Sequence, residues 1–374
     1  MKVRRWLVML LPASALSALP GSPLHAQSSV TLYGIVDESV RYLTHTNTAG
    51  DSTLGLGTGG MSESRWGLRG TDDLGGGWSA FFRIENRFTI NTGQSDPTLP
   101  FFNEAQVGVQ SPSYGRLIIG RQPNVLIEGI TIGGYGSNPW IPYDFSFQPE
   151  VTMSGGIWTS NQVQYQARVA GVTFAAGYAF GGVAGHLSYG SQYGAAVAWS
   201  PKDGPLNLGG AYEETRDSLN GSTAKAWTFG GAFVWDGTRA ALGYIVNRND
   251  VGFSNFANGP FTAPVLAALK YTDFSRRRMI FGGVTQALGD AWHLALNVWR
   301  TLQDGKTDAQ DGSAWQCQFV ADYSLSKRTD VYVEADYALY RGDLIGAQLQ
   351  GVNSVGLAQK STQVGLMAGL RHLF

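Results

Sequence analysis

The sequence predicts an all-β fold: a transmembrane antiparallel barrel of about 16 strands, with short periplasmic turns, long extracellular loops and an inward-folded third loop. Three observations predict it. Apolar residues alternate with small or polar ones along nearly the whole chain, as in Val364, Leu366, Ala368 and Leu370 near its end, and such alternation gives a strand two different faces. Charged residues are only 15% of the chain, against roughly 25% in soluble domains. The breaks between strands alternate in length.

The first 26 residues have the pattern of a secretory signal peptide. Lys2, Arg4 and Arg5 precede an apolar stretch that ends at Leu19, and residues 22–26 resemble a cleavage region. We expect residues 1–26 to be removed on export through the Sec pathway, which leaves residues 27–374 as the barrel. After Leu19 no apolar run approaches the roughly 20 residues of a membrane-spanning helix.

The breaks alternate between tight turns and long loops. We expect turns at residues 73–77, 111–115, 169–171, 200–205, 236–238, 288–291 and 325–328. We expect loops at residues 44–60, 91–101, 122–156, 180–190, 216–222, 249–275, 303–312 and 341–360. Turns on one side and loops on the other are typical of an outer-membrane barrel.

Closure of the sheet follows from the solvent. Hydrocarbon offers no partner to an unpaired backbone group, so the first strand must pair with the last. About 16 tilted strands enclose water, whereas about eight would be filled by side chains. The strands also run longer than the usual 5–6 residues, which disfavours the alternative of a soluble β-sandwich or propeller.

Arginines cluster on two neighbouring strands. In the segment Ser64 to Gly70, Trp66 and Leu68 alternate with Arg65 and Arg69. The next strand repeats the pattern, since its apolar residues alternate with Arg83, Glu85 and Arg87. We expect these four arginines to form a basic patch on the inner wall, where passing ions feel its field. The alternative is a wall that is merely polar.

The loop at residues 122–156 is too long for a passive connection. We expect it to fold into the pore and narrow it, rather than to cover the surface. Its carboxylates would face the arginines, and its aromatic residues, with Trp158 just beyond, could form a stacking surface. The expected acidic residues are Glu128, Asp144 and Glu150, and the expected aromatic residues are Tyr135, Trp140, Tyr143 and Trp158.

Several motifs resemble those of the trimeric 16-stranded general porins of Gram-negative bacteria, of the Neisseria and Burkholderia type. They are Ser29 to Gly34 (SVTLYG), Ser64 to Leu74 (SRWGLRGTDDL), Gly120-Arg121-Gln122, Ser324 to Val331 (SLSKRTDV) and Gly369 to Phe374 (GLRHLF), and they span the mature chain. The resemblance implies a homotrimer in outer-membrane lipid that lets small hydrophilic solutes diffuse passively through a constriction at loop 3.

Residue by residue, the resemblance places Arg65 and Arg121 in the basic wall and makes Phe374 the signal read by the barrel-assembly machinery. Alternation supports Arg65 independently. It does not support Arg121, which shares its parity with Leu117 and Ile119. Some relatives carry an arginine where this chain has residues 159–161 (Thr-Ser-Asn), and loop 3 lacks the Pro-Glu-Phe-Gly tip of enterobacterial relatives.

The sequence leaves two channel functions open. The leading one is a general diffusion porin, and the alternative is a substrate-selective channel whose aromatic loop 3 binds an aromatic or sugar-like solute. An outer-membrane enzyme would need a nucleophile with a histidine base, and no serine motif surrounds His186 or His293. We expect no catalytic residues, cofactor or metal, and with a formal net charge of −1 no nucleic-acid partner. The sign of ion selectivity stays open.

Overall fold

The computed structural model of the protein describes residues 29–136, 148–202, 204–347, 349 and 360–374. Within these ranges the chain forms a closed antiparallel sheet, because β18 pairs with β1 from Ile35–Leu373 to Leu43–Gly365. The expected signal segment 1–26 lies outside the described residues, as do Trp140, Tyr143 and Asp144 of loop 3.

The strands follow one another around the barrel in chain order. They are β1 (Ser29–Leu43), β2 (Thr53–Thr58), β3 (Arg65–Gly75), β4 (Trp78–Thr89), β5 (Gln94–Ser95), β6 (Glu104–Ser111), β7 (Gly115–Pro123), β8 (Trp158–Val169), β9 (Val172–Ala179), β10 (Gln192–Trp199), β11 (Leu206–Arg216), β12 (Thr223–Trp235), β13 (Thr238–Asn249), β14 (Phe274–Leu288), β15 (Trp292–Gly305), β16 (Gly312–Ser324), β17 (Thr329–Gly342) and β18 (Thr362–Leu373). The helical segments are α1 (Val125–Gly133), η1 (Pro149–Met153), α2 (Ala263–Ala268) and η2 (Asp308–Gln310).

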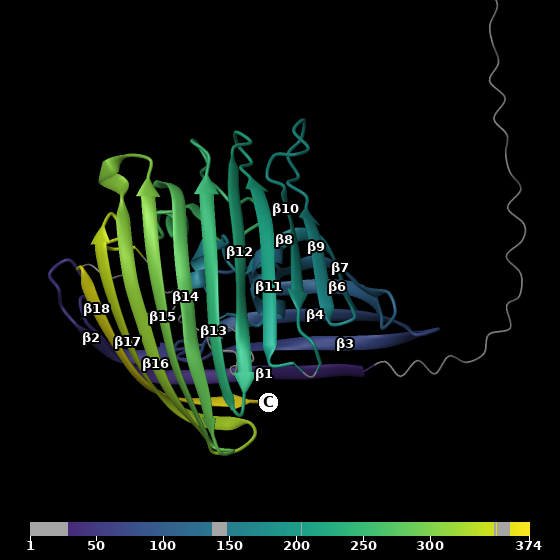
Figure 1. Cartoon of the computed structure of the whole chain (residues 1–374), viewed down its shortest axis with the longest axis horizontal. Helices are drawn as coiled ribbons and strands as arrows, with labels where there is room; N and C mark the ends of the chain where they lie inside the picture. The colour runs from purple at the N-terminus through teal and green to yellow at the C-terminus, as the bar shows by residue number, and fades with distance from the viewer. Residues whose placement is uncertain (1–28, 137–147, 203, 348, 350–359) are drawn as a thin grey trace, which may run out of the picture.

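Together these segments form a barrel wall of 16 strands in the described chain. β2 and β3 pair in turn with successive parts of β1, so together they form one wall strand, and β5 only adds a short pairing to the end of β4. The near and far strands run in different directions in Figure 1, as strands tilted to a barrel axis do. The predicted fold is confirmed.

One predicted loop is shorter than expected. Residues 44–60 were expected to form a single loop, but Thr53–Thr58 is strand β2, paired with Glu38–Leu43 of β1. Leu54 and Leu56 alternate with Gly55 and Gly57 there, and the glycines make the segment resemble a loop. Pairing with β1 overrides that weak local preference, because an unpaired edge in the wall would be costly.

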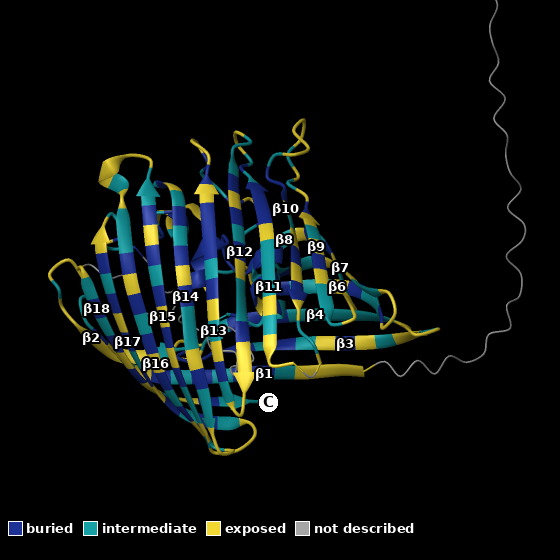
Figure 2. Ribbon diagram, in the orientation of Figure 1, coloured by how far each residue is buried: buried dark blue, intermediate teal, exposed yellow. Residues whose placement is uncertain are grey.

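The two faces of each strand lie where alternation places them. On β17 and β18, Val333, Leu366 and Leu370 are exposed on the outer face, whereas Tyr332 and Glu334 are buried on the inner face. Figure 2 shows this as bands of buried and exposed residues along the strands. Across the described ranges, no helix has both the length and the apolar character to cross a membrane.

Candidate functional site

The arginines of β3 and β4 lie directly opposite one another in the sheet. Arg65 faces Arg87 across the ladder and Arg69 faces Arg83, so the four form two levels on the inner wall. Like charges placed directly opposite destabilise a sheet. Glu85, on the same face and between the two levels, supplies the opposite charge.

Glu85 is 1% exposed and is held by four side chains. Its carboxylate lies 3.5 Å from Arg65 Nη1 and 2.9 Å from Arg83 Nη2. Tyr33 Oη donates to it at 3.1 Å and Asn103 Nδ2 at 3.0 Å. The cluster therefore balances its own buried charge, which orders the arginines instead of leaving them mobile.

The charges that reach water in this cluster are positive. Arg69 is exposed, the Arg83 side chain is 30% exposed, and both guanidinium groups lie about 5 Å from the ring centre of Tyr33. Glu104, which lies 3.2 Å from Arg83 Nε, is 4% exposed. A solute in the lumen therefore meets guanidinium groups before it meets carboxylates.

The guanidinium group of Arg87 lies over the ring of Trp158. The guanidinium carbon of Arg87 lies 4.3 Å from the ring centre of Trp158, and the two residues are 7% and 4% exposed. A cation over an aromatic face is an attractive arrangement. Trp158 was expected to offer a stacking surface to a solute, but its ring is already covered.

Arg121 lies at an irregularity of the sheet. The pairing of β7 with β8 shifts between Gly120 and Gln122, and Gly120 has a φ of 128°, which favours glycine. Arg121 Nε donates to Asn103 O at 2.9 Å and Nη1 donates to Ser160 Oγ at 2.7 Å. These two partners belong to the strand ends next to the Glu85 cluster.

Loop 3 folds inside the barrel and begins with helix α1. Asn124 caps the helix by accepting from Ile127 N at 2.8 Å, and Gly134 ends it in the left-handed region, with a φ of 64°. The helix packs against β9, β10, β11 and β12. A Cβ added to Gly129 would lie 2.5 Å from Ala211 Cβ and 3.2 Å from Ala196 Cβ. Small residues on both surfaces therefore let the helix lie close to the wall.

Tyr135, just after α1, anchors the loop. Its side chain is 0% exposed, its hydroxyl lies 3.1 Å from Thr228 Oγ1, and its ring packs near Phe281. Arg239 adds hydrogen bonds to Gly134 O and, at 2.9 Å, to Gly136 O. Tyr135 was expected to face a solute, and its burial corrects that role: it holds loop 3 against β12 and β14.

The two described loop carboxylates are each held by the wall. Glu128 Oε1 accepts from Gln166 Nε2 at 2.6 Å on β8. Glu150, in η1, is 2% exposed and accepts from Trp299 Nε1 at 2.7 Å on β15. Asp144, the third expected carboxylate, lies outside the described residues, as do Trp140 and Tyr143.

A second inward segment was not predicted. Between β2 and β3, Met61 and Ser62 donate their backbone N–H groups to Asp37 Oδ2, and Tyr332 Oη donates to Asp37 Oδ1 at 2.6 Å. Arg371 Nη1 donates to Ser62 Oγ at 2.9 Å. The available sequence signal was Asp37 itself, an acidic residue at an inner-face position of the first strand.

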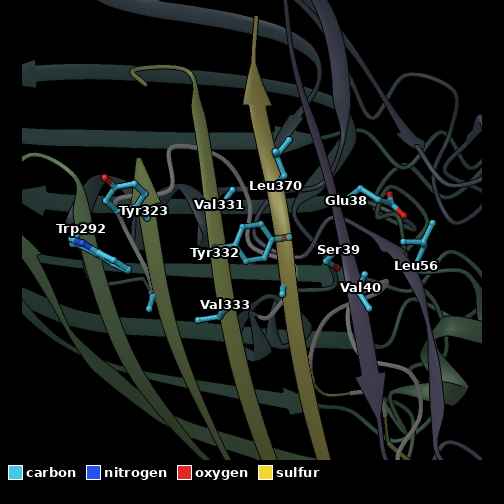
Figure 3. A pocket seen from close by; sticks show the side chains of 13 residues that line it. Glu38, Ser39, Val40, Leu56, Trp292, Tyr323, Val331, Tyr332, Val333 and Leu370 are labelled. Carbon is cyan, nitrogen blue, oxygen red and sulfur yellow. The ribbon is translucent and has the colours of Figure 1, made fainter. Parts of the chain in front are cut away.

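The outer face carries a shallow groove where β17, β18 and β1 meet (Figure 3). Its volume is about 570 Å³, and most of its lining is apolar, including Val40, Leu56 and Val333. Glu38 at its edge accepts a hydrogen bond from Thr58 Oγ1 at 2.9 Å. The groove lies on the opposite side of the wall from the arginine cluster.

Comparison with known proteins agrees with this architecture. Residues 13–343 match the Gram-negative porin family. An outer membrane porin protein of Bordetella pertussis is 28% identical over 98% of this chain and 99% of its own length, and outer membrane porin protein 32 of Delftia acidovorans is 29% identical over 97% and 99%. The anion-selective porin from Comamonas acidovorans superposes with a TM-score of 0.72 at 25% identity, covering 93% of this chain and 100% of that one.

A trimer form of OmpT from Vibrio cholerae matches with a TM-score of 0.66 at 16% identity, covering 93% of this chain and 99% of that one, which supports the fold alone. The family match spans most of the chain, and both the barrel and its inward loop are in place. The chain therefore belongs to the Gram-negative porin family and forms a water-filled outer-membrane channel for passive diffusion.

Proposed function

We propose that this porin is a general diffusion channel that prefers anions, and that its basic wall is formed by Arg65, Arg69, Arg83 and Arg87. One observation carries the preference. Arg69 and Arg83 reach water, whereas Glu85 and Glu104 beside them are almost fully buried. The anion-selective porin from Comamonas acidovorans, which shares the fold, supports the same sign.

Arg69→Gln tests the anion preference. A unit charge about 7 Å from an ion in water contributes about 0.6 kcal/mol, which raises the local anion concentration and lowers the local cation concentration by roughly 2–3-fold each, so that their ratio changes by roughly 7-fold. The reversal potential under a KCl gradient in planar bilayers should shift toward cations by that factor. Arg248→Gln is the matched control, because Arg248 is exposed near the extracellular end of β13. A cation-selective wild type, or equal shifts in both variants, would contradict the proposal.

The substrate-selective alternative receives less support. Of its four expected aromatic residues, Tyr135 and Trp158 are buried and occupied by protein contacts. The other two, Trp140 and Tyr143, lie outside the described residues. Arg121, Glu128 and Glu150 complete the proposed constriction as groups that hold loop 3 and its rim in place. We also infer that the chain acts as a channel and not as an enzyme.

We further infer a homotrimer, as the solved trimer form of a structural neighbour suggests. Native mass spectrometry in detergent should give three times the mass of the mature chain, and a monomer would contradict it. Maturation by cleavage after residue 26 remains part of the proposal, and N-terminal sequencing of the purified protein tests it.

Phe374 is proposed as the residue read by the barrel-assembly machinery. Its backbone exchanges hydrogen bonds of 3.0 and 3.1 Å with Gly34, so it also closes the seam between β18 and β1. Because Phe374 would serve both recognition and closure of the seam, two measurements are needed to separate these roles. They are the assembly yield in cells and the refolding yield in detergent. Recognition by the machinery requires that Phe374→Ala lower the first more than the second.

A further inference from the structure

A second group of arginines lies on the inner wall, nearer the short turns than the constriction. A pocket of about 760 Å³ opens there, and its lining includes Arg116, Arg168, Gln110 and Gln166 from the wall and Ile132 from α1. We propose that this pocket is a binding subsite for small organic carboxylates, distinct from the constriction.

The strand register brings the polar groups into one row. Ser79 of β4 is paired with Gln110 of β6, Gln110 with Arg116 of β7, and Arg116 with Gln166 of β8. Neighbouring strands are about 4.8 Å apart. Hydroxyl, amide and guanidinium donors therefore follow one another at a spacing that a carboxylate, with two acceptor oxygens, can bridge.

Arg116 has hydrogen-bonding capacity left for a ligand. Its Nε is shielded from solvent and has no hydrogen-bond partner among the described residues. Arg116 as a whole is only half-buried, and its guanidinium makes no ion pair among the described residues, so an anion in the pocket can pair with its charge. Arg168 adds a second positive charge, and one of its donors is engaged, with Nη2 donating to Ser200 O at 2.8 Å.

The acidic groups nearby are already engaged. Asp73 is the acidic residue of the lining, and its Oδ1 accepts from Gly75 N at 2.9 Å in the turn. Glu128 of α1 borders the pocket through Gln166, whose Nε2 donates to it at 2.6 Å. The lining itself has two arginines and one aspartate, and Glu128 at its border is engaged by Gln166, so the lining surface is net positive and favours an anion over a cation.

The pocket also has apolar lining, which suits a ligand with an apolar body. Ile132 of α1 contributes apolar surface on the inner side of the wall. A carboxylate with a compact apolar body would place its charge at Arg116 and its body against Ile132. We therefore use benzoate as the test ligand, with benzyl alcohol as its uncharged counterpart.

The pocket is separated from the constriction along the wall. Ser79 and Arg83 lie on the same face of β4, four residues apart, which is about 13 Å at roughly 3.3 Å per residue. A solute can thus occupy the pocket without contacting Arg69. The subsite does not depend on the proposed anion preference, because reversal potential reports the constriction and benzoate block reports the pocket.

The test uses the full mature porin in planar bilayers. Benzoate should reduce the KCl current saturably, with a lower half-blocking concentration from the side of the short turns, and benzyl alcohol should not. Arg116→Gln should raise the half-blocking concentration about tenfold, the usual effect of removing one charge-assisted hydrogen bond. Arg248→Gln should leave it unchanged, and an unaltered single-channel conductance shows that each variant is folded.

Two results would overturn the inference. One is a block that is absent, unsaturable or equal from both sides. The other is an Arg116→Gln channel of normal conductance that benzoate still blocks with the wild-type half-blocking concentration. If reversal potentials show anion preference while the block fails, the constriction proposal survives and the subsite is lost. If the block holds without anion preference, the reverse is true.

Discussion

Asp217→Asn should loosen the extracellular rim while leaving the barrel intact. Asp217 follows β11, its side chain is 0% exposed, and each of its carboxylate oxygens accepts three hydrogen bonds. Oδ1 accepts from Leu219 N, Asn220 N and Asn255 Nδ2, and Oδ2 accepts from Ser254 N, Ser254 Oγ and Asn255 N, at 2.7–3.3 Å. One side chain thus ties residues 217–222 to residues 250–256.

The magnitude follows from the number of donors. An amide replaces one carboxylate oxygen with an NH₂ group, which points a donor at three donors whichever way it is turned. Each hydrogen bond to a charged group is worth about 1.5–3 kcal/mol. Since the freed donors can partly reach water at the rim, we expect about 3 kcal/mol of local destabilisation, less than the sum. By the usual conversion this is a roughly 100-fold faster opening.

Hydrogen exchange of the folded porin in detergent measures this opening. Amides of residues 217–222 and 250–256 should exchange roughly 100 times faster in Asp217→Asn, while those of β11 and β12 keep their protection. Asp308→Asn, at an exposed position in another loop, is the control. Exchange rates within about twofold of wild type in both loops would refute the reasoning that this carboxylate holds them together.

The same clamp should depend on pH. Burial raises the pKa of Asp217, but the hydrogen bonds from Leu219, Ser254 and Asn220 outweigh it and hold this pKa below its ordinary value. The stabilisation is therefore fully present above the ordinary aspartate pKa of about 3.9. It is lost as pH falls through the lower pKa of the folded state. Wild-type loop exchange should rise in that acidic range relative to Asp217→Asn, and a flat difference between the two would contradict the assignment.

Two glycine substitutions give further predictions. Gly129→Leu should push α1 away from the wall, because even a Cβ there would lie 2.5 Å from Ala211 Cβ; we expect a lower single-channel conductance, and conductance equal to wild type would contradict the close packing of α1. Gly34→Val should weaken the seam by about 1–3 kcal/mol, since its Cβ would lie 2.3 Å from the Phe374 ring and 2.7 Å from Arg65 O. Urea unfolding in detergent measures that cost, and an unchanged midpoint would show that the Phe374 ring moves freely.

The wall was predictable from the sequence, because alternation is a local property. Outer and inner faces of β15 and β17 could be assigned from residue parity alone, as Leu296 and Val333 on the outside and Tyr332 on the inside show. Arg65, Arg69, Arg83 and Arg87 could be placed on one wall for the same reason. Their positions in two directly opposed pairs required the register, which alternation does not specify.

The interior was less predictable, because what fills it comes from distant parts of the chain. Loop 3 was expected to fold inward from its length, yet nothing local shows that Tyr135 ends against Phe281 or that Trp158 lies beneath Arg87. Such contacts join segments that meet only when the barrel closes. The inward turn at Met61 and Ser62 is a further case, since its partner Asp37 lies on β1 and is itself held by Tyr332 of β17.

By itself, the sequence determined the barrel, the sidedness of its strands and the basic character of one wall, because each follows from short-range periodicity and the lack of hydrogen-bonding partners in lipid. Only the tertiary structure decided which charges reach water. Burial of Glu85 and Glu104, with Arg69 left exposed and Arg83 partly exposed, depends on how neighbouring strands pack around each side chain. Solvent exposure is a property of the closed barrel, and it is what leaves guanidinium groups at the surface of this cluster.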